Sequence, residues 1–143
     1  MRLIVLGCSG SGPGPTSPAS GYLVEAGGVH LVLDLGNGTL GALQRHVDPW
    51  RLTAVAFSHL HPDHCADMSA LYVHRRYHPR PPADRSRLPV FAPAEAPDRF
   101  AAAYAPDAAE PAHLVVALGP SSGATGYDTL DVSSDVPWAT LRD

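Results

Sequence analysis

The chain has 143 residues, of which 45% are hydrophobic and 17% are charged, and its formal net charge at pH 7 is −4. This composition is typical of one globular domain with a real core and argues against a disordered chain. The net negative charge disfavours a general nucleic-acid binder. No apolar run approaches the roughly 18 residues of a membrane-spanning helix, and two cysteines are too few for a disulfide framework. We therefore expect a cytoplasmic protein that does not enter a membrane.

Apolar runs separated by glycine-rich segments predict three strands near the beginning of the chain. They cover residues 3–6, 22–25 and 29–34, and Gly27-Gly28 is typical of a hairpin turn between the last two. Residues 7–21, between the first two strands, are rich in Gly, Pro and Ser and predict a loop.

The rest of the chain predicts helices that alternate with strands. In chain order we expect a helix at 40–47 capped by Asn37 or Thr39, a strand at 52–57, a helix at 65–77, a short strand at 90–91, a helix at 94–104 and a strand at 114–118. Alternating strands and helices predict an α/β layered domain.

Three histidines and one aspartate follow the strand predicted at 52–57, in the sequence His59-Leu60-His61-Pro62-Asp63-His64. Imidazole nitrogens and carboxylate oxygens are ligands of zinc and similar divalent ions. Residues i and i+2 of an extended segment point the same way, so His59 and His61 can reach one ion together. Pro62 bars the helical region for His61 and forces a turn, after which Asp63 and His64 face back toward a second ion. The alternative is a helix capped by Asp63, with histidines at the surface.

This motif resembles the metal signature of the metallo-β-lactamase superfamily. Leu33-Asp34-Leu35-Gly36-Asn37-Gly38-Thr39 resembles the aspartate–glycine turn of the ribonuclease Z-like members, and Leu6-Gly7-Cys8-Ser9-Gly10 resembles their first strand and glycine loop. The resemblance covers about residues 1–110 and implies the first half of a metallo-β-lactamase-like β/α/α/β sandwich. Residues 111–143 have no family character, and we expect an irregular tail there.

The resemblance also implies roles for the motif residues. His59 and His61 would bind one zinc ion, and Asp63 and His64 the other, with manganese or iron as alternative metals. Asp34 would accept a hydrogen bond from a ligand imidazole and fix its tautomer; the alternative is a simple turn residue. A water activated by the metals is the nucleophile in this family, and Asp63 would also orient that water.

The chain has one basic cluster, in and after the helix predicted at 65–77. Its Arg75 and Arg76 are candidates for holding a phosphodiester or an RNA backbone beside the metal site. The alternative is a solvated helix end whose charges suit the helix dipole. We expect Cys8 and Cys65 to be small buried residues rather than metal ligands.

These features predict a metal-dependent hydrolase, with a phosphodiesterase similar to ribonuclease Z as the first hypothesis. A second hypothesis is another hydrolase of the superfamily that acts on a lactone, a thioester or a β-lactam. A third is a non-catalytic fragment that binds metal weakly, or that needs a second copy or a complementing chain. It arises because no histidine after His64 matches the family's later ligands, so each ion would have two protein ligands where a catalytic zinc needs about three.

Overall fold

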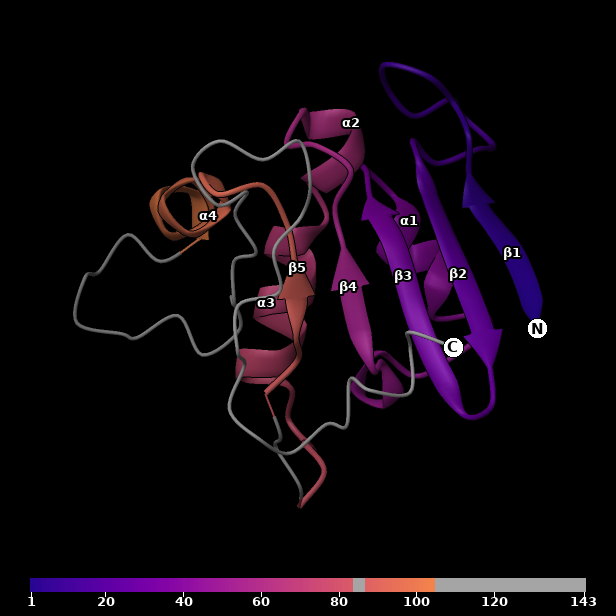
Figure 1. Ribbon diagram of the computed structural model, residues 1–143, viewed down its shortest axis with the longest axis vertical. Helices are drawn as coiled ribbons and strands as arrows, with labels where there is room; N and C mark the ends of the chain where they lie inside the picture. Colours follow the sequence, from indigo (N-terminus) through magenta and orange to yellow (C-terminus); the bar gives the residue numbers. More distant parts are fainter. Residues whose placement is uncertain (84–86, 105–143) are drawn as a thin grey trace.

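The computed structural model describes residues 1–83 and 87–104. Their centre is a 5-stranded sheet in the order β1-β2-β3-β4-β5, which Figure 1 shows face-on. Strand β2 pairs antiparallel with both β1 and β3, whereas β3, β4 and β5 run parallel. The strands are β1 (Arg2–Gly7), β2 (Gly21–Ala26), β3 (Val29–Leu35), β4 (Ala54–Ala56) and β5 (Val90–Phe91).

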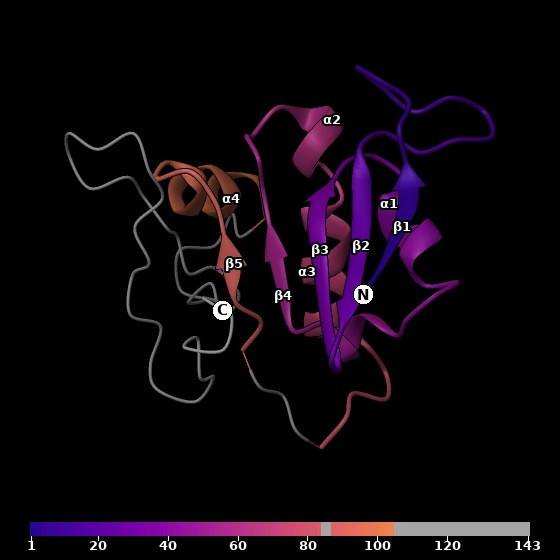
Figure 2. The same ribbon diagram turned by 45° about the vertical axis from the view of Figure 1, so that its right-hand side comes forward.

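All the helices except α4 lie in the connections between the parallel strands, as parallel pairing requires a crossover. They are α1 (Thr39–Leu43), the 3-10 helix η1 (Pro49–Arg51), α2 (Pro62–Cys65), α3 (Met68–Tyr77) and α4 (Ala96–Tyr104). In Figures 1 and 2, α1 and α3 lie against one face of the sheet, α4 lies beside β5, and α2 lies at the upper end of the sheet. No helix in the described ranges is long and apolar enough to cross a membrane.

The hydrophobic core lies between the sheet and the helices. Strand residues that point to the helices are fully buried, for example Leu23, Val32 and Val55, and they pack with Leu43 of α1 and Leu71 of α3. These strand residues alternate with side chains that point away from the helices, because successive residues of a strand face opposite sides. The α/β layered domain expected from the sequence is therefore confirmed.

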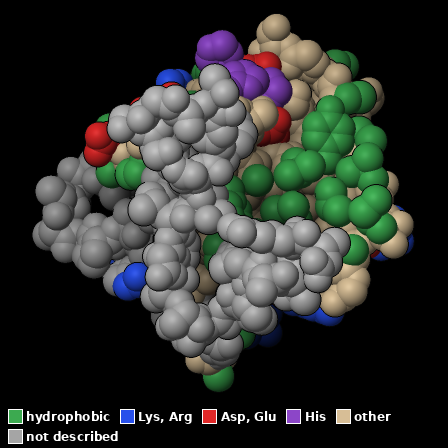
Figure 3. All heavy atoms as spheres, viewed as in Figure 1, with side chains coloured by type: hydrophobic (Ala, Val, Ile, Leu, Met, Phe, Trp, Pro, Cys, Tyr) green, Lys and Arg blue, Asp and Glu red, His purple; other side chains and the backbone are tan. Residues whose placement is uncertain are grey.

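The face of the sheet away from α1 and α3 is also apolar, and we call it the open sheet face. Two of its side chains are strongly exposed, Leu3 at 60% and Val5 at 56%. Strand register aligns them with half-buried neighbours, and together the residues of this face are Leu3, Val5, Tyr22, Val24, Leu31 and Leu33. Figure 3 shows hydrophobic side chains gathered over these strands. Exposed apolar patches of this kind mark interaction surfaces.

Several helix boundaries differ from the sequence prediction. The helix expected at 40–47 is α1 at Thr39–Leu43, and the one expected at 94–104 begins at Ala96. The helix expected at 65–77 begins later, as α3 at Met68–Tyr77, and Asp67 is its N-cap rather than part of its first turn. A separate short helix, α2 at Pro62–Cys65, precedes it. The cap expected at Asn37 or Thr39 was also wrong, because α1 begins after Gly38 and no side chain at its N-cap accepts a hydrogen bond. Instead the Asp67 carboxylate accepts from the Leu40 N–H at 2.8 Å. The Asp67 carboxylate thus supports the start of α1, while the backbone of Asp67 lies at the N-cap of α3.

Other predictions fare differently. The strand expected at 52–57 is shorter, at Ala54–Ala56, whereas the strand at 90–91 is confirmed. Cys65 is buried as expected, but Cys8 lies exposed in the loop after β1, so its predicted burial was wrong. The strand at 114–118 and the tail at 111–143 lie outside the described residues, and the boundary at residue 110 stays a prediction.

Gly36 packs against the turn that carries the histidine motif. A Cβ atom at Gly36 would overlap the carbonyl oxygen of Asp63. The same carbonyl accepts from the Ser20 N–H at 3.1 Å, and the Ser20 carbonyl accepts from the Gly36 N–H at 2.9 Å. The backbone after β3 therefore holds the backbone of α2 in place, and only glycine permits this close approach.

We expect Gly36→Ala to lower the free energy of unfolding by about 1–3 kcal/mol or more, because the added methyl group overpacks a backbone contact. Gly41→Ala is the matched control, since a Cβ there meets nothing within 4 Å. It should leave stability unchanged or raise it by about 0.5–1 kcal/mol, because Gly41 lies within α1. Urea unfolding followed by circular dichroism measures both, and equal stabilities for the two variants would contradict the packing assigned to Gly36.

Candidate metal centre

The histidine motif lies in the turn between β4 and α2. His61 is the N-cap of α2, with extended backbone angles of φ −68° and ψ 147°, and Pro62 occupies the first helical turn. A proline at this position stops the extended segment and starts the helix, because the backbone N–H that proline lacks would have no partner within the helix there. The N–H groups of His64 and Cys65 both donate to the His61 carbonyl. The chain therefore reverses direction between His61 and Asp63, as the sequence predicts.

The reversal brings three imidazoles and a carboxylate together at one end of the sheet. The ring centroids of His59 and His61 are 4.7 Å apart, and those of His59 and His64 are 3.9 Å apart. The Nε2 atom of His64 lies 3.4 Å from an Asp63 carboxylate oxygen. Figure 3 shows histidine side chains beside acidic ones at the upper end of the molecule.

Hydrogen bonds to the carboxylate of Asp34, a buried residue of β3, hold part of this turn in place. Asp34 is the second-last residue of β3, has a left-handed conformation with φ 59°, and is buried. Its carboxylate accepts from the Ser58 backbone N–H at 2.8 Å and lies within 3.0 Å of the Ser58 hydroxyl. His64 Nδ1 lies 2.8 Å from Asp34 Oδ2. The structure thus brings Asp34 against one of the candidate ligand imidazoles.

Ser58 was not singled out from the sequence, although it precedes His59 directly. The signal available was a hydroxyl residue at the carboxyl end of a buried strand, next to a metal motif. Its contact with Asp34 joins residues 24 positions apart, so local sequence spacing does not reveal it.

The donors fit divalent metal in type and in pairwise spacing. Two ligands bound 2.0–2.1 Å from a tetrahedral zinc ion lie about 3.3–3.4 Å apart, which matches the 3.4 Å between His64 Nε2 and Asp63 Oδ2. Within residues 1–83 and 87–104, however, no group of three or more His, Cys, Asp or Glu side chains is arranged to hold an ion. Each ion would therefore take further ligands from outside the described residues.

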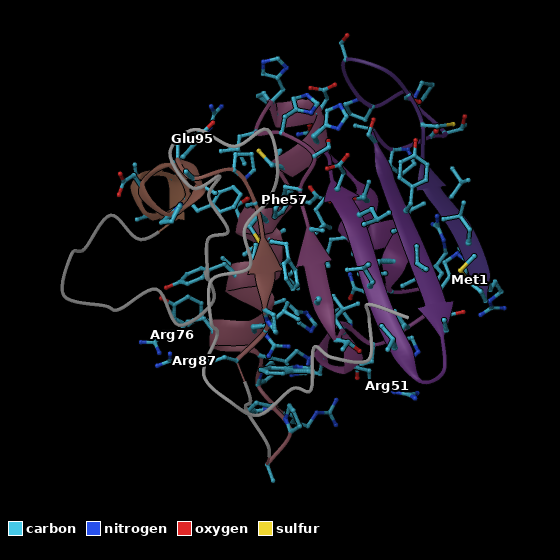
Figure 4. All side chains as sticks on the ribbon, viewed as in Figure 1. Met1, Arg51, Phe57, Arg76, Arg87 and Glu95 are labelled. Carbon is cyan, nitrogen blue, oxygen red and sulfur yellow. The ribbon has the colours of Figure 1, made fainter. Side chains whose placement is uncertain are left out.

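The structure does not bring the candidate substrate arginines to this turn. Arg75 and Arg76 lie in the last turn of α3, and Figure 4 shows Arg76 far from the end of the molecule where Figure 3 shows the histidines. The Arg75 guanidinium lies 4.4 Å from the centre of the Trp50 ring and donates to the Pro49 carbonyl. Burial lowers its pKa. A substrate contact by Arg75 or Arg76 stays a prediction.

Cys65 is placed as a core residue rather than as a ligand. Its side chain is buried, and its Sγ donates to the Leu60 carbonyl at 3.4 Å. Burial raises the pKa of the Cys65 thiol, which disfavours the thiolate form that binds metals.

Comparison with known proteins identifies the family. The sequence model of the metallo-beta-lactamase superfamily matches residues 14–128. The chain is 51% identical to an uncharacterized protein of Mycobacterium tuberculosis over 107 residues, which are 74% of this chain and 38% of that protein. An uncharacterized protein of Mycobacterium leprae is 53% identical over 107 residues, which are 74% of this chain and 37% of that protein. The chain belongs to the metallo-beta-lactamase superfamily.

Solved structures show the same fold. The metallo-beta-lactamase fold protein YhfI from Bacillus subtilis superimposes with a TM-score of 0.68 at 26% identity, over 82% of this chain and 45% of that one. Human tRNase Z, short form, gives a TM-score of 0.69 at 22% identity, over 85% of this chain and 46% of that one. This chain therefore spans less than half the length of these relatives and structures. The prediction of a metallo-β-lactamase-like fold is confirmed.

Asp34→Asn tests the support given to His64. Asparagine keeps the shape and tolerates the left-handed conformation, but it loses the negative charge that favours the Nδ1–H form of the imidazole. We expect zinc affinity to fall about 10–100-fold, as is usual when such a supporting group is lost. A competing chromophoric chelator measures the affinity.

Asp48→Asn is the matched control for that variant. Asp48 caps η1 through the Trp50 N–H and makes no contact with the histidine turn. Its replacement should leave zinc affinity within about twofold of the wild-type value. If Asp34→Asn behaves like this control, Asp34 has no role in presenting a metal ligand.

Proposed function

We propose that this chain forms the histidine-bearing half of a metal-dependent hydrolase that cleaves phosphodiesters in the manner of a ribonuclease Z. The observation that carries the proposal is the turn between β4 and α2, which gathers three imidazoles and one carboxylate over a buried aspartate. Membership of the metallo-beta-lactamase superfamily supports the reaction class. The fold shared with human tRNase Z supports phosphodiesters, RNA included, as the substrate class.

Each candidate ligand has a defined part in this proposal. His59 and His61 hold one divalent ion, and Asp63 and His64 hold the other, with zinc preferred and manganese or iron as alternatives. When bound, such ions lower the pKa of a water molecule and polarise the scissile group. The Asp63 carboxylate lies in the first turn of α2, where it also orients the attacking water. Asp34 accepts from His64 Nδ1 and thereby directs Nε2 of that ring toward the ion.

Substrate assays separate the phosphodiesterase from other hydrolases of the superfamily. Bis-p-nitrophenyl phosphate is the phosphodiester probe, and a thioester, a lactone and a β-lactam are the comparison substrates. Turnover of the phosphodiester supports the proposal. Cleavage of a lactone, thioester or β-lactam without cleavage of the phosphodiester would overturn the assigned substrate class.

Alanine variants of His59 and His61 test the ligand assignment. Each change removes one of the two imidazoles assigned to the first ion. We therefore expect the zinc content per chain, measured by elemental analysis, to fall by the amount that this ion contributes. Phosphodiester hydrolysis should fall by at least about 100-fold. His78→Ala is the control, because His78 follows α3 and pairs with His74 instead of the turn. Unchanged metal content in both His59→Ala and His61→Ala would refute the assignment.

The open sheet face favours a second candidate, in which this chain binds metal but becomes a hydrolase only when further polypeptide completes it. Leu3 and Val5 on that face are 60% and 56% exposed. The matched region accounts for 38% of the Mycobacterium tuberculosis relative. We propose that the open sheet face packs against polypeptide corresponding to the remainder of that relative, which also supplies the further metal ligands.

Val5→Glu tests this packing, since a buried carboxylate without a partner is costly. Mixed with the remaining portion of the Mycobacterium tuberculosis relative, the wild-type chain should co-elute as a 1:1 complex in gel filtration with light scattering. We expect Val5→Glu to weaken that complex at least about tenfold.

Val73→Glu is the matched control, because Val73 is also exposed, at 53%, but lies on α3. Equal effects of Val5→Glu and Val73→Glu would exclude the open sheet face as the contact. A dimer of this chain without the added polypeptide would instead identify a second copy as the partner.

A further inference from the structure

The Ser58 hydroxyl has one hydrogen atom and lies close to the side chains of Asp34, His59 and His64. It is 2.8 Å and 3.0 Å from the two carboxylate oxygens of Asp34. It is also 3.0 Å from His59 Nδ1 and 3.4 Å from His64 Nδ1. A hydroxyl donates once and accepts up to twice, an ionised carboxylate only accepts, and a neutral imidazole nitrogen does one or the other. These capacities determine the direction of each hydrogen bond.

The hydrogen of Ser58 must point to Asp34. If it pointed to His59 instead, the Ser58 oxygen would face two carboxylate oxygens within 3.0 Å with no hydrogen between them, which is repulsive. With the hydroxyl donating to Asp34, His59 Nδ1 can only donate to the Ser58 oxygen. His59 then carries its hydrogen on Nδ1 and has a bare Nε2.

The Asp34 carboxylate also determines the tautomer of the His64 imidazole. His64 Nδ1 is 2.8 Å from Asp34 Oδ2, and because the carboxylate only accepts, Nδ1 must donate. The Nε2 atom of His64 then faces the Asp63 carboxylate at 3.4 Å. A cation between these two atoms would turn this contact into a pair of ligand bonds.

We propose that Ser58 is a positioning residue that extends the control of Asp34 from His64 to His59. Through this hydroxyl, one buried carboxylate sets the tautomers of two imidazoles that are assigned to different ions. Both rings are therefore presented with a bare Nε2 before any metal arrives. The effect on metal affinity rests on the proposed function, whereas the tautomers are a property of the metal-free chain.

Long-range ¹H–¹⁵N correlation spectra of the metal-free, ¹⁵N-labelled chain at pH 8 read the tautomers directly. His59→Gln and His64→Gln variants assign the two rings. We expect both rings to be Nδ1–H in the wild-type chain. Ser58→Ala should shift His59 to a mixture dominated by Nε2–H, the more common form of a free side chain, while His64 keeps Nδ1–H through Asp34. An Nε2–H form of His59 in the wild-type chain would overturn the proposal.

Zinc competition gives the second readout. Ser58→Ala should weaken zinc binding about tenfold, at the lower end of the range for lost supporting groups. Ser58→Thr retains the hydroxyl and should restore both the affinity and the His59 tautomer. Ser69→Ala is the control, because its hydroxyl donates only to the Ala66 carbonyl within the helical region.

The outcomes distinguish this inference from the proposed function. A changed His59 tautomer in Ser58→Ala, together with rescue by threonine, supports the inference whether or not the chain hydrolyses a phosphodiester. Zinc affinity of Ser58→Ala within twofold of the wild-type value would overturn the positioning role. Equal losses in Ser58→Ala and Ser58→Thr would assign Ser58 a steric role instead, and circular dichroism of each variant shows whether the fold persists.

Discussion

The Asp34 carboxylate is the contact on which the histidine end of the molecule depends. It extends from the end region of β3, and it accepts from the Ser58 backbone after β4 and from His64 in α2. A buried charge is costly unless it is hydrogen-bonded. Here the donors to the carboxylate belong to the two chain segments that carry the candidate metal ligands, so the same hydrogen bonds hold those segments in place. The left-handed backbone of Asp34 is maintained because these contacts require it.

Much of the described part of the chain could be predicted from local sequence. The apolar runs, Gly27-Gly28 and Pro62 each act on their own neighbourhood, so strands, hairpin and turn follow from a few adjacent residues. Contacts between distant residues could not be predicted in this way. Asp67 supports the start of α1 across 27 positions, and its own N–H, between α2 and α3, donates to the Leu35 carbonyl. Ser58 contacts Asp34 across 24 positions.

Which face of the sheet the helices cover is a further feature that the sequence does not predict. Alternating residues in β2 and β3 are apolar on both faces, and the pattern alone does not say which face the helices cover. In the structure α1 and α3 cover the face of Leu23 and Val32, while Leu3 and Val5 on the other face are exposed. Apolar burial contributes about 25 cal/mol per Å², so the open sheet face gives a contacting polypeptide a substantial gain in stability.

The proposed contact with further polypeptide would account both for the open sheet face and for the small number of candidate ligands around each ion within the described residues. In the described residues, no three candidate ligands are arranged around one ion, and the matched region accounts for less than half of the relatives. If one polypeptide both covers the open sheet face and supplies further ligands, its binding and zinc binding share a coupling free energy. Such coupling is reciprocal, so zinc must tighten the complex by the same factor by which the polypeptide tightens zinc. In such an assembly the hydrogen bonds around Asp34 and Ser58 would lower the cost of binding, because they order the candidate ligands His59 and His64 in advance.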